Sequence, residues 1–152
     1  MSSTFYSMFD RKPVELSEHV CSMKERFPEA KVYVGTDSQN FSKHTIYVTT
    51  VVFRFPMNGA HVIYHKHKVK RVNDMWSRLW HEMGQSVEIA QHIEQNCGVK
   101  VHQIDMDMNE DPKYPSNKVL KAAQGFIESM GFKAMAKPNI LMATRAANAL
   151  CH

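Results

Sequence analysis

Hydrophobic and polar residues alternate in three stretches of the first half of the chain. Residues 31–37, 45–55 and 61–70 are rich in β-branched and aromatic side chains, which is typical of strands. Turn-prone residues separate these stretches at 38–44 and 56–59. Because short connections join antiparallel neighbours, we expect a three-stranded meander. Lysines along residues 61–70 favour an edge position for the third strand, where charge discourages wrong pairing.

Helical spacing of apolar residues dominates the second half of the chain. Apolar positions recur every three or four residues from Met75 to about residue 95, and Asp74 can cap this helix. A shorter helix is expected at residues 14–27, where Pro28 ends it. The other predicted elements are a strand at 99–106, a helix from Ser116 to Gly131, a strand at 132–136 and a helix at about 140–150.

The predicted order is three strands, helix, strand, helix, strand, helix, after an N-terminal helix. Strands that alternate with helices join a sheet in parallel, so we expect a mixed sheet. This order matches the ribonuclease H fold, an α/β architecture with a five-stranded mixed sheet and helices on both faces. The length of 152 residues suits a single domain over residues 1–152, with residues 1–30 as a helical extension.

Composition and charge narrow the functional classes. The 19 Lys and Arg residues exceed the 15 Asp and Glu residues, and the net charge of +4 permits contact with a phosphate backbone. No apolar run approaches the ~20 residues of a membrane span, and no secretory signal is evident. The three cysteines form no CxxC pair, so we expect reduced thiols in a cytoplasmic protein, with Cys21 and Cys97 as small packing residues.

Two aspartates lie where strand carboxylates can meet. Asp37 follows an apolar strand, and Asp105 lies within the strand predicted at 99–106. If these are neighbouring central strands, the two carboxylates come close together, and a divalent cation is their natural partner. A turn or cap role is an equally good interpretation of Asp37. A carboxylate inside an apolar strand, such as Asp105, is unusual unless it is paired.

Three glutamates on the helix after Asp74 differ in direction. At about 100° per residue, Glu82 projects from the flank of the buried face, and Glu88 points towards solvent. Glu94 falls near the apolar direction but in the last turn. A metal-binding carboxylate should lie at the boundary between core and cleft, which favours Glu82.

Several short motifs resemble the YkuK-like proteins, a ribonuclease-H-like family. The resemblance implies a ribonuclease H fold and an acidic site of Asp37, Glu82 and Asp105. The matching motifs, which follow in the same order over roughly residues 10–150, are Val34-Gly35-Thr36-Asp37-Ser38-Gln39, Ile104-Asp105, Asn117-Lys118, residues 127–131, Lys137-Pro138 and residues 146–148. From the matching motifs we expect nucleic-acid contacts by Ser38, Gln39, Asn117 and Lys118.

The fourth metal position of this superfamily is often acidic, and here it corresponds to Asn148. A neutral amide adds no negative charge to a metal site, so this departure weakens the case for full nuclease activity. Asp107, two residues after Asp105, is a candidate to compensate for it. An aspartate at the entry to a loop is an equally good interpretation of Asp107.

The densest basic stretch of the chain is a candidate nucleic-acid surface. It is either a solvated strand edge or a surface that follows a phosphate backbone beside the acidic cleft. Its members are Lys66, Lys68, Lys70 and Arg71.

Histidines and tryptophans offer weaker candidates. His61, His65 and His67 suggest a metal cluster, but no nearby Cys or acidic residue completes a zinc site, so surface histidines are the simpler interpretation. Trp76 and Trp80 suit core positions on their helix better than a role in stacking on bases.

Two hypotheses about function remain. In the first, Asp37, Glu82 and Asp105 hold Mg²⁺ or Mn²⁺ and the protein hydrolyses nucleic acid, with RNA or an RNA–DNA hybrid as the default substrate. In the second, the protein is a non-catalytic binding or assembly protein that kept the ribonuclease H fold, as Asn148 would suggest. Neither hypothesis involves a membrane.

Overall fold

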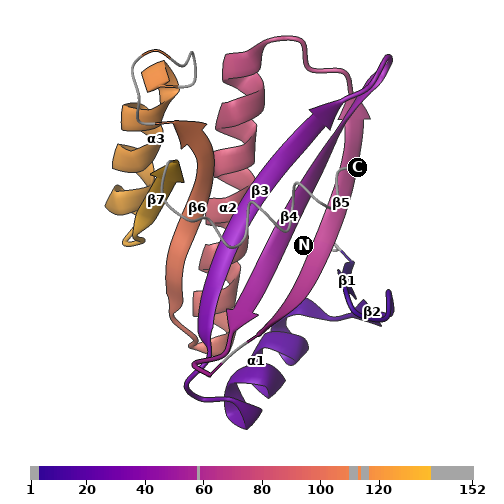
Figure 1. Cartoon of the computed structure of the whole chain (residues 1–152), viewed down its shortest axis with the longest axis vertical. Helices are drawn as coiled ribbons and strands as arrows, with labels where there is room; N and C mark the ends of the chain where they lie inside the picture. The colour runs from indigo at the N-terminus through magenta and orange to yellow at the C-terminus, as the bar shows by residue number, and fades with distance from the viewer. Residues whose placement is uncertain (1–3, 58, 110–112, 114–116, 138–152) are drawn as a thin grey trace.

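The computed structural model describes residues 4–57, 59–109, 113 and 117–137. These residues form a mixed sheet of seven strands and three helices (Figure 1). The strands are β1 (Phe5–Ser7), β2 (Pro13–Val14), β3 (Lys31–Asn40), β4 (His44–Arg54), β5 (Ala60–Lys70), β6 (Val101–Asn109) and β7 (Ala134–Lys137). The helices are α1 (Leu16–Arg26), α2 (Met75–Cys97) and α3 (Asn117–Ser129).

The sheet has the order β2-β1-β5-β4-β3-β6-β7, so β4 lies at its centre and β3 is an inner strand between β4 and β6. β3, β4 and β5 form the predicted antiparallel meander, and β3 pairs with β6, and β6 with β7, in parallel. The α/β fold class predicted from the sequence is therefore confirmed. In Figure 1 the short strands β1 and β2 lie at one edge of the sheet and β7 lies at the other.

One face of the sheet carries the main hydrophobic core. Alternate residues of β3, such as Val32 and Val34, are fully buried there in one cluster with apolar residues of α1, α2 and α3. Because strand residues alternate between faces, Tyr33, Gly35 and Asp37 point to the opposite face. The last helix, expected at 140–150, lies outside the described residues, so helices on both faces stay a prediction.

Local signals fix the two ends of α2. Asp74 is the N-cap, as predicted, and its carboxylate accepts hydrogen bonds from the backbone N–H groups of Trp76 and Ser77. Gly98 ends the helix in the left-handed conformation, with a φ of 63°, which glycine adopts without steric cost. None of the helices in the described ranges is long and apolar enough to cross a membrane.

The sequence-based prediction differs from the structure in three places. β1 and β2 were not predicted, because strands of three and two residues are too short to show alternation. β3 continues to Asn40, where polar residues had predicted a turn from residue 38. The edge assignment of β5 is wrong in part, because β1 pairs with it at Ile63 and Tyr64. The expectation of one domain is not tested by the structure and stays a prediction.

Candidate active site

Two aspartates lie on the same face of adjacent parallel strands. Val34 pairs with Ile104, and Gly35 pairs with Asp105. Paired residues share a face, and residues two apart on one strand also share it, so Asp37 faces the same side as Asp105. The two aspartates therefore lie on one face of neighbouring parallel strands, and their role as a shared site stays a prediction.

Both aspartates are almost completely buried and are oriented from within their own strands. Asp37 is 6% exposed and Asp105 is 2% exposed. The backbone N–H of Ser38 donates to Asp37 Oδ1 at 2.8 Å, and Gln103 Nε2 donates to Asp105 Oδ1 at 2.7 Å. These donors replace part of the hydration that a buried carboxylate loses.

Glu82 reaches the same end of β3 from α2, on the other side of the sheet. Ser38 donates its hydroxyl hydrogen to Glu82 Oε2. One turn along α2, Ser86 Oγ lies 2.8 Å from Thr36 Oγ1. Glu82 and Ser86 are four residues apart, which is a rise of about 6 Å along the helix. Ser38 and Thr36 are two residues apart, which is about 6.7 Å along the strand. The two contacts therefore match when α2 lies along β3. Glu82 is thereby held at the boundary between the core and the strand ends.

Burial and several neighbouring charged groups change the pKa of Glu82. Burial raises the pKa of Glu82 well above its usual value, and the nearby negative charge of Asp37 raises it further. Asp107 also raises this pKa, whereas the Ser38 hydroxyl and the charge of Arg78 lower it. The carboxylates of α2, β3 and β6 therefore repel one another, as the ligands of a divalent cation do before it binds.

A small cavity lies between α2 and the ends of β3 and β6. Its volume of about 10 Å³ is close to the space of one water molecule. Residues of both strands and of the helix line it, namely Thr36, Glu82, Met83, Asp105, Met106 and Asp107.

A family model described as Ribonuclease H-like matches residues 15–152. The chain belongs to the ribonuclease H-like family. No curated protein and no solved structure matches the chain. Membership in this family confirms the predicted family and points to a function that involves nucleic acid. The family match does not assign ligands, so the roles of Asp37, Glu82 and Asp105 stay predictions.

In their chemistry alone, the carboxyl groups of Asp37, Glu82 and Asp105 are of the kind that Mg²⁺ or Mn²⁺ binds. Both ions prefer carboxylate oxygens, and a cation would relieve the repulsion around Glu82. Within the part of the chain that the structure describes, no group of three or more His, Cys, Asp or Glu side chains is arranged to hold an ion. The fourth expected position, Asn148, lies outside the described residues.

The predicted nucleic-acid contacts fall into two groups. Lys66 is aligned with Asp37, because Val48 of β4 pairs with both residues, and Lys66, Lys68 and Lys70 are all exposed. Asn117 and Lys118 begin α3, which packs on β6 and β7 at the other side of the sheet. The lysines of β5 and the start of α3 therefore lie towards opposite edges of the sheet, with β3 and β4 between them.

Two predicted contact residues, Ser38 and Arg71, also have structural partners, and a third, Gln39, is partly covered. The Ser38 hydroxyl is used by Glu82, and Gln39 is half-buried. Arg71 donates to the carbonyl of Phe41 and, at 2.7 Å, to Asn73 Oδ1. Arg71 thus joins the β3–β4 turn to the segment after β5, which is a structural role that the basic run did not indicate.

The histidines do not form a zinc site within the described residues. His61 Nε2 lies 2.8 Å from His19 Nε2, and burial lowers the pKa of both imidazoles. His65 Nδ1 lies 2.9 Å from the carbonyl oxygen of Thr4. The interpretation of His65 and His67 as surface residues agrees with the structure, in which His65 is half-buried and His67 is exposed.

Two expectations about packing are wrong. Trp76 and Trp80 are 48% and 43% exposed, because the apolar stripe of α2 is wider than the face that the sheet buries. Cys21 is exposed on α1, so it is not a core packing residue. The contact between the hydroxyl groups of Thr36 and Ser86 was not predicted from the sequence. A serine four residues after Glu82, on the same apolar face of the helix, is the pattern that indicates it.

Proposed function

We propose that this ribonuclease H-like protein is a divalent-metal-dependent nuclease that hydrolyses phosphodiester bonds. The observation that carries the proposal is that three buried carboxyl groups, from β3, β6 and α2, lie around the second half of β3. Asp37 and Asp105 lie on one face of adjacent parallel strands, and Asp37 raises the pKa of Glu82. Buried like charges of this kind cost stability, and in enzymes they are typical of sites that hold cations.

Mg²⁺ or Mn²⁺, when bound, would activate water at neutral pH and stabilise the negative charge that develops on the leaving oxygen. Asp37 and Asp105 are the proposed strand ligands, and Glu82 is the proposed helix ligand. Gln103 and the backbone N–H of Ser38 hold the two aspartates in place. Glu82 loses its proton when it binds a cation, so the affinity for metal should rise with pH.

The default substrate is RNA or an RNA–DNA hybrid, by analogy with the fold alone. Exposed Lys66, aligned with Asp37 across β4, supports a nucleic acid as the ligand because it places positive charge close to the carboxylates. Adjacent strands lie ~4.8 Å apart, which puts the Lys66 backbone roughly 10 Å from that of Asp37.

Cleavage of single-stranded RNA, RNA–DNA hybrid, and single- and double-stranded DNA with Mg²⁺ or Mn²⁺ tests the proposal. Asp37→Asn, Asp105→Asn and Glu82→Gln should each lower the rate at least tenfold. Glu88→Gln is the matched control, because Glu88 lies on the same helix but is exposed. If Asp37→Asn cleaves as fast as the wild type, the activity comes from another site or from a contaminant.

A second candidate function is a non-catalytic nucleic-acid-binding protein with the same fold. It is favoured by the lack of a three-ligand group among the described residues and by Asn148 in the sequence. Asn148→Asp should increase Mg²⁺-dependent cleavage if the nuclease proposal is correct. Salt-dependent binding without cleavage by either the wild type or Asn148→Asp would favour the binding protein.

A further inference from the structure

Two rows of paired residues connect the candidate active site with the edge of the sheet that carries β1. The first row crosses five strands and consists of Asp105, Gly35, Thr50, Tyr64 and Tyr6. The neighbouring row contains Asp37, Val48 and Lys66. Paired residues point to the same face, so the two tyrosines and Lys66 share a face with both aspartates. Three strand spacings put the backbone of Tyr64 about 14 Å from that of Asp105.

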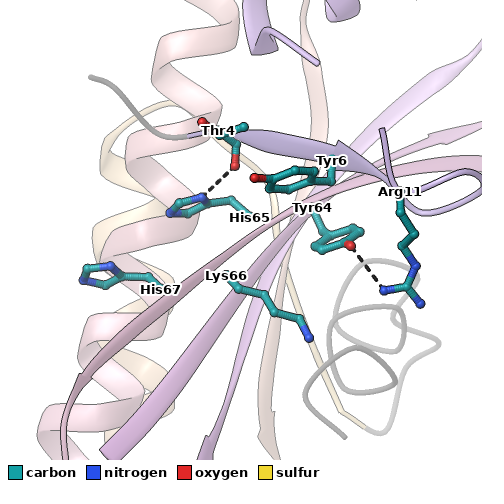
Figure 2. Close-up of a pocket in the computed structure, with 7 residues that line it drawn as sticks. All are labelled: Thr4, Tyr6, Arg11, Tyr64, His65, Lys66 and His67. Carbon is teal, nitrogen blue, oxygen red and sulfur yellow. Dashed lines mark hydrogen bonds between the residues drawn. The ribbon is translucent and has the colours of Figure 1, made fainter. Parts of the chain in front are cut away.

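The far end of these rows is hollowed into a groove that Tyr6, Arg11, Tyr64 and Lys66 line (Figure 2). We call it the tyrosine groove, and its volume is about 830 Å³. The Tyr6 and Tyr64 rings lie 6.0 Å apart and are tilted by 35°. Tyr64 is nearly buried, whereas Tyr6 is 37% exposed, so Tyr6 presents the accessible ring.

Arg11 is placed in the groove by a backbone conformation that arginine rarely adopts. Its φ of 63° is the one positive value among the non-glycine residues that the structure describes. The turn between β1 and β2 holds this conformation through hydrogen bonds from Ser7 N to the Lys12 carbonyl and from Arg11 N to the Ser7 carbonyl. Unusual backbone geometry of this kind is concentrated at functional sites.

The guanidinium of Arg11 lies over the Tyr64 ring, 5.8 Å from its centroid, and Nη1 donates to the Tyr64 hydroxyl at 3.3 Å. That contact uses one of five N–H donors. Arg11 is exposed, as is Lys66, and Figure 2 shows both side chains extending to the same side of Tyr64. The groove therefore combines two cations with an accessible aromatic ring.

We propose that the tyrosine groove binds a single-stranded segment of nucleic acid, with a base on the Tyr6 ring and phosphates at Arg11 and Lys66. The inference takes its class of ligand, nucleic acid, from the proposed function. Aromatic rings stack on bases that are exposed in a single strand, and cations follow its backbone. A duplex keeps its bases stacked inside, so it offers phosphates but no base face to Tyr6. The groove thus selects substrates with an unpaired segment next to the scissile bond.

Binding of fluorescein-labelled single-stranded RNA and DNA, measured by anisotropy in EDTA, tests the inference without cleavage. Tyr6→Leu should weaken binding by between about 5-fold and 150-fold, while Tyr6→Phe keeps the ring and binds like the wild type. The slope of log K against log salt is negative for the wild type. In the double variant Arg11→Gly with Lys66→Gln it should become less steep by about 1.4, which is 0.7 for each lost phosphate contact. Glycine suits the positive φ of residue 11, so this variant keeps the turn.

Lys100→Gln with Lys121→Gln is the matched control, because it removes two exposed positive charges far from the groove. The control should leave the salt slope of the wild type unchanged or make it less steep by a smaller amount than the groove variant does. Equal effects of the two double variants would overturn the inference, as would tighter binding of a duplex than of its single strand. Unchanged binding by Tyr6→Leu would overturn the stacking of a base on Tyr6.

The inference and the proposed function fail in different measurements. If Asp37→Asn abolishes cleavage while the groove variants bind and cleave like the wild type, the nuclease proposal stands and the groove proposal is wrong. If nothing is cleaved but the groove variants lose single-strand binding, the groove proposal stands and the nuclease proposal is wrong.

Discussion

Glu82→Gln should make the metal-free protein more stable, by an amount that grows with pH. Burial and the charge of Asp37 raise the pKa of Glu82 in the folded state, so the folded state holds a proton that the unfolded state releases above pH ~4.3. This proton contributes its full share to the free energy of unfolding below the pKa of Glu82 in the unfolded state. The contribution is lost as pH rises through the pKa of Glu82 in the folded state. Glutamine is neutral throughout, and its oxygen can still accept the Ser38 hydroxyl.

The expected magnitude follows from proton linkage. In the pH window between the unfolded and folded pKa values of Glu82, the unfolded state binds about one proton fewer than the folded state. The free energy of unfolding of the wild type then falls by up to ~1.4 kcal/mol for each pH unit, relative to the glutamine variant. Glu82 is only 4% exposed, so solvent screens this effect little.

Urea denaturation in EDTA at half-unit steps from pH 4 to pH 8 measures this difference. Glu88→Gln serves as the control, and its difference from the wild type should stay nearly flat, because Glu88 is exposed. Mn²⁺ should reverse the order, since a ligand at 100 times its Kd stabilises the wild type by ~2.7 kcal/mol and the variant by less. A flat or falling difference for Glu82→Gln in EDTA would refute the argument that Glu82 is a destabilised buried acid.

Four further outcomes are expected. Asp105→Asn should abolish the rise in Tm that Mn²⁺ produces in the wild type; an undiminished rise would exclude Asp105 as a ligand. Ser86→Ala should lower the free energy of unfolding in urea by ~1 kcal/mol, because Thr36 keeps its other hydroxyl contact. Asp74→Ala should cost ~1 kcal/mol in the same assay through loss of the cap. Burial, with the contact to Cys21, raises the pKa of Cys97 to about 12, so iodoacetamide at pH 8 should label exposed Cys21 before Cys97 in peptide mapping.

Local pattern was enough to predict the elements that carry the acidic residues. Alternation predicted the meander, and Asp74 with helical spacing predicted α2 and the direction of Glu82. These signals are local, since the periods of 2 and 3.6 residues reflect the backbone of one segment. The placement of Asp37 and Asp105 on adjacent strands followed from the element order, because strands separated by helices pair in parallel.

Tertiary structure alone decided which side chains meet. The contact of Ser38 with Glu82 depends on how α2 lies along β3, and the row from Asp105 to Tyr6 depends on the register of five strands. Arg11 had no signal in the sequence, because its position comes from a turn held by β1 and β2, which are too short to predict. Trp80 shows the same limit: its spacing suited the core, but the sheet buries a narrower face of α2 and leaves Trp80 exposed. Sequence periodicity sets which side of an element is apolar, and only packing between elements sets how much of that side is covered.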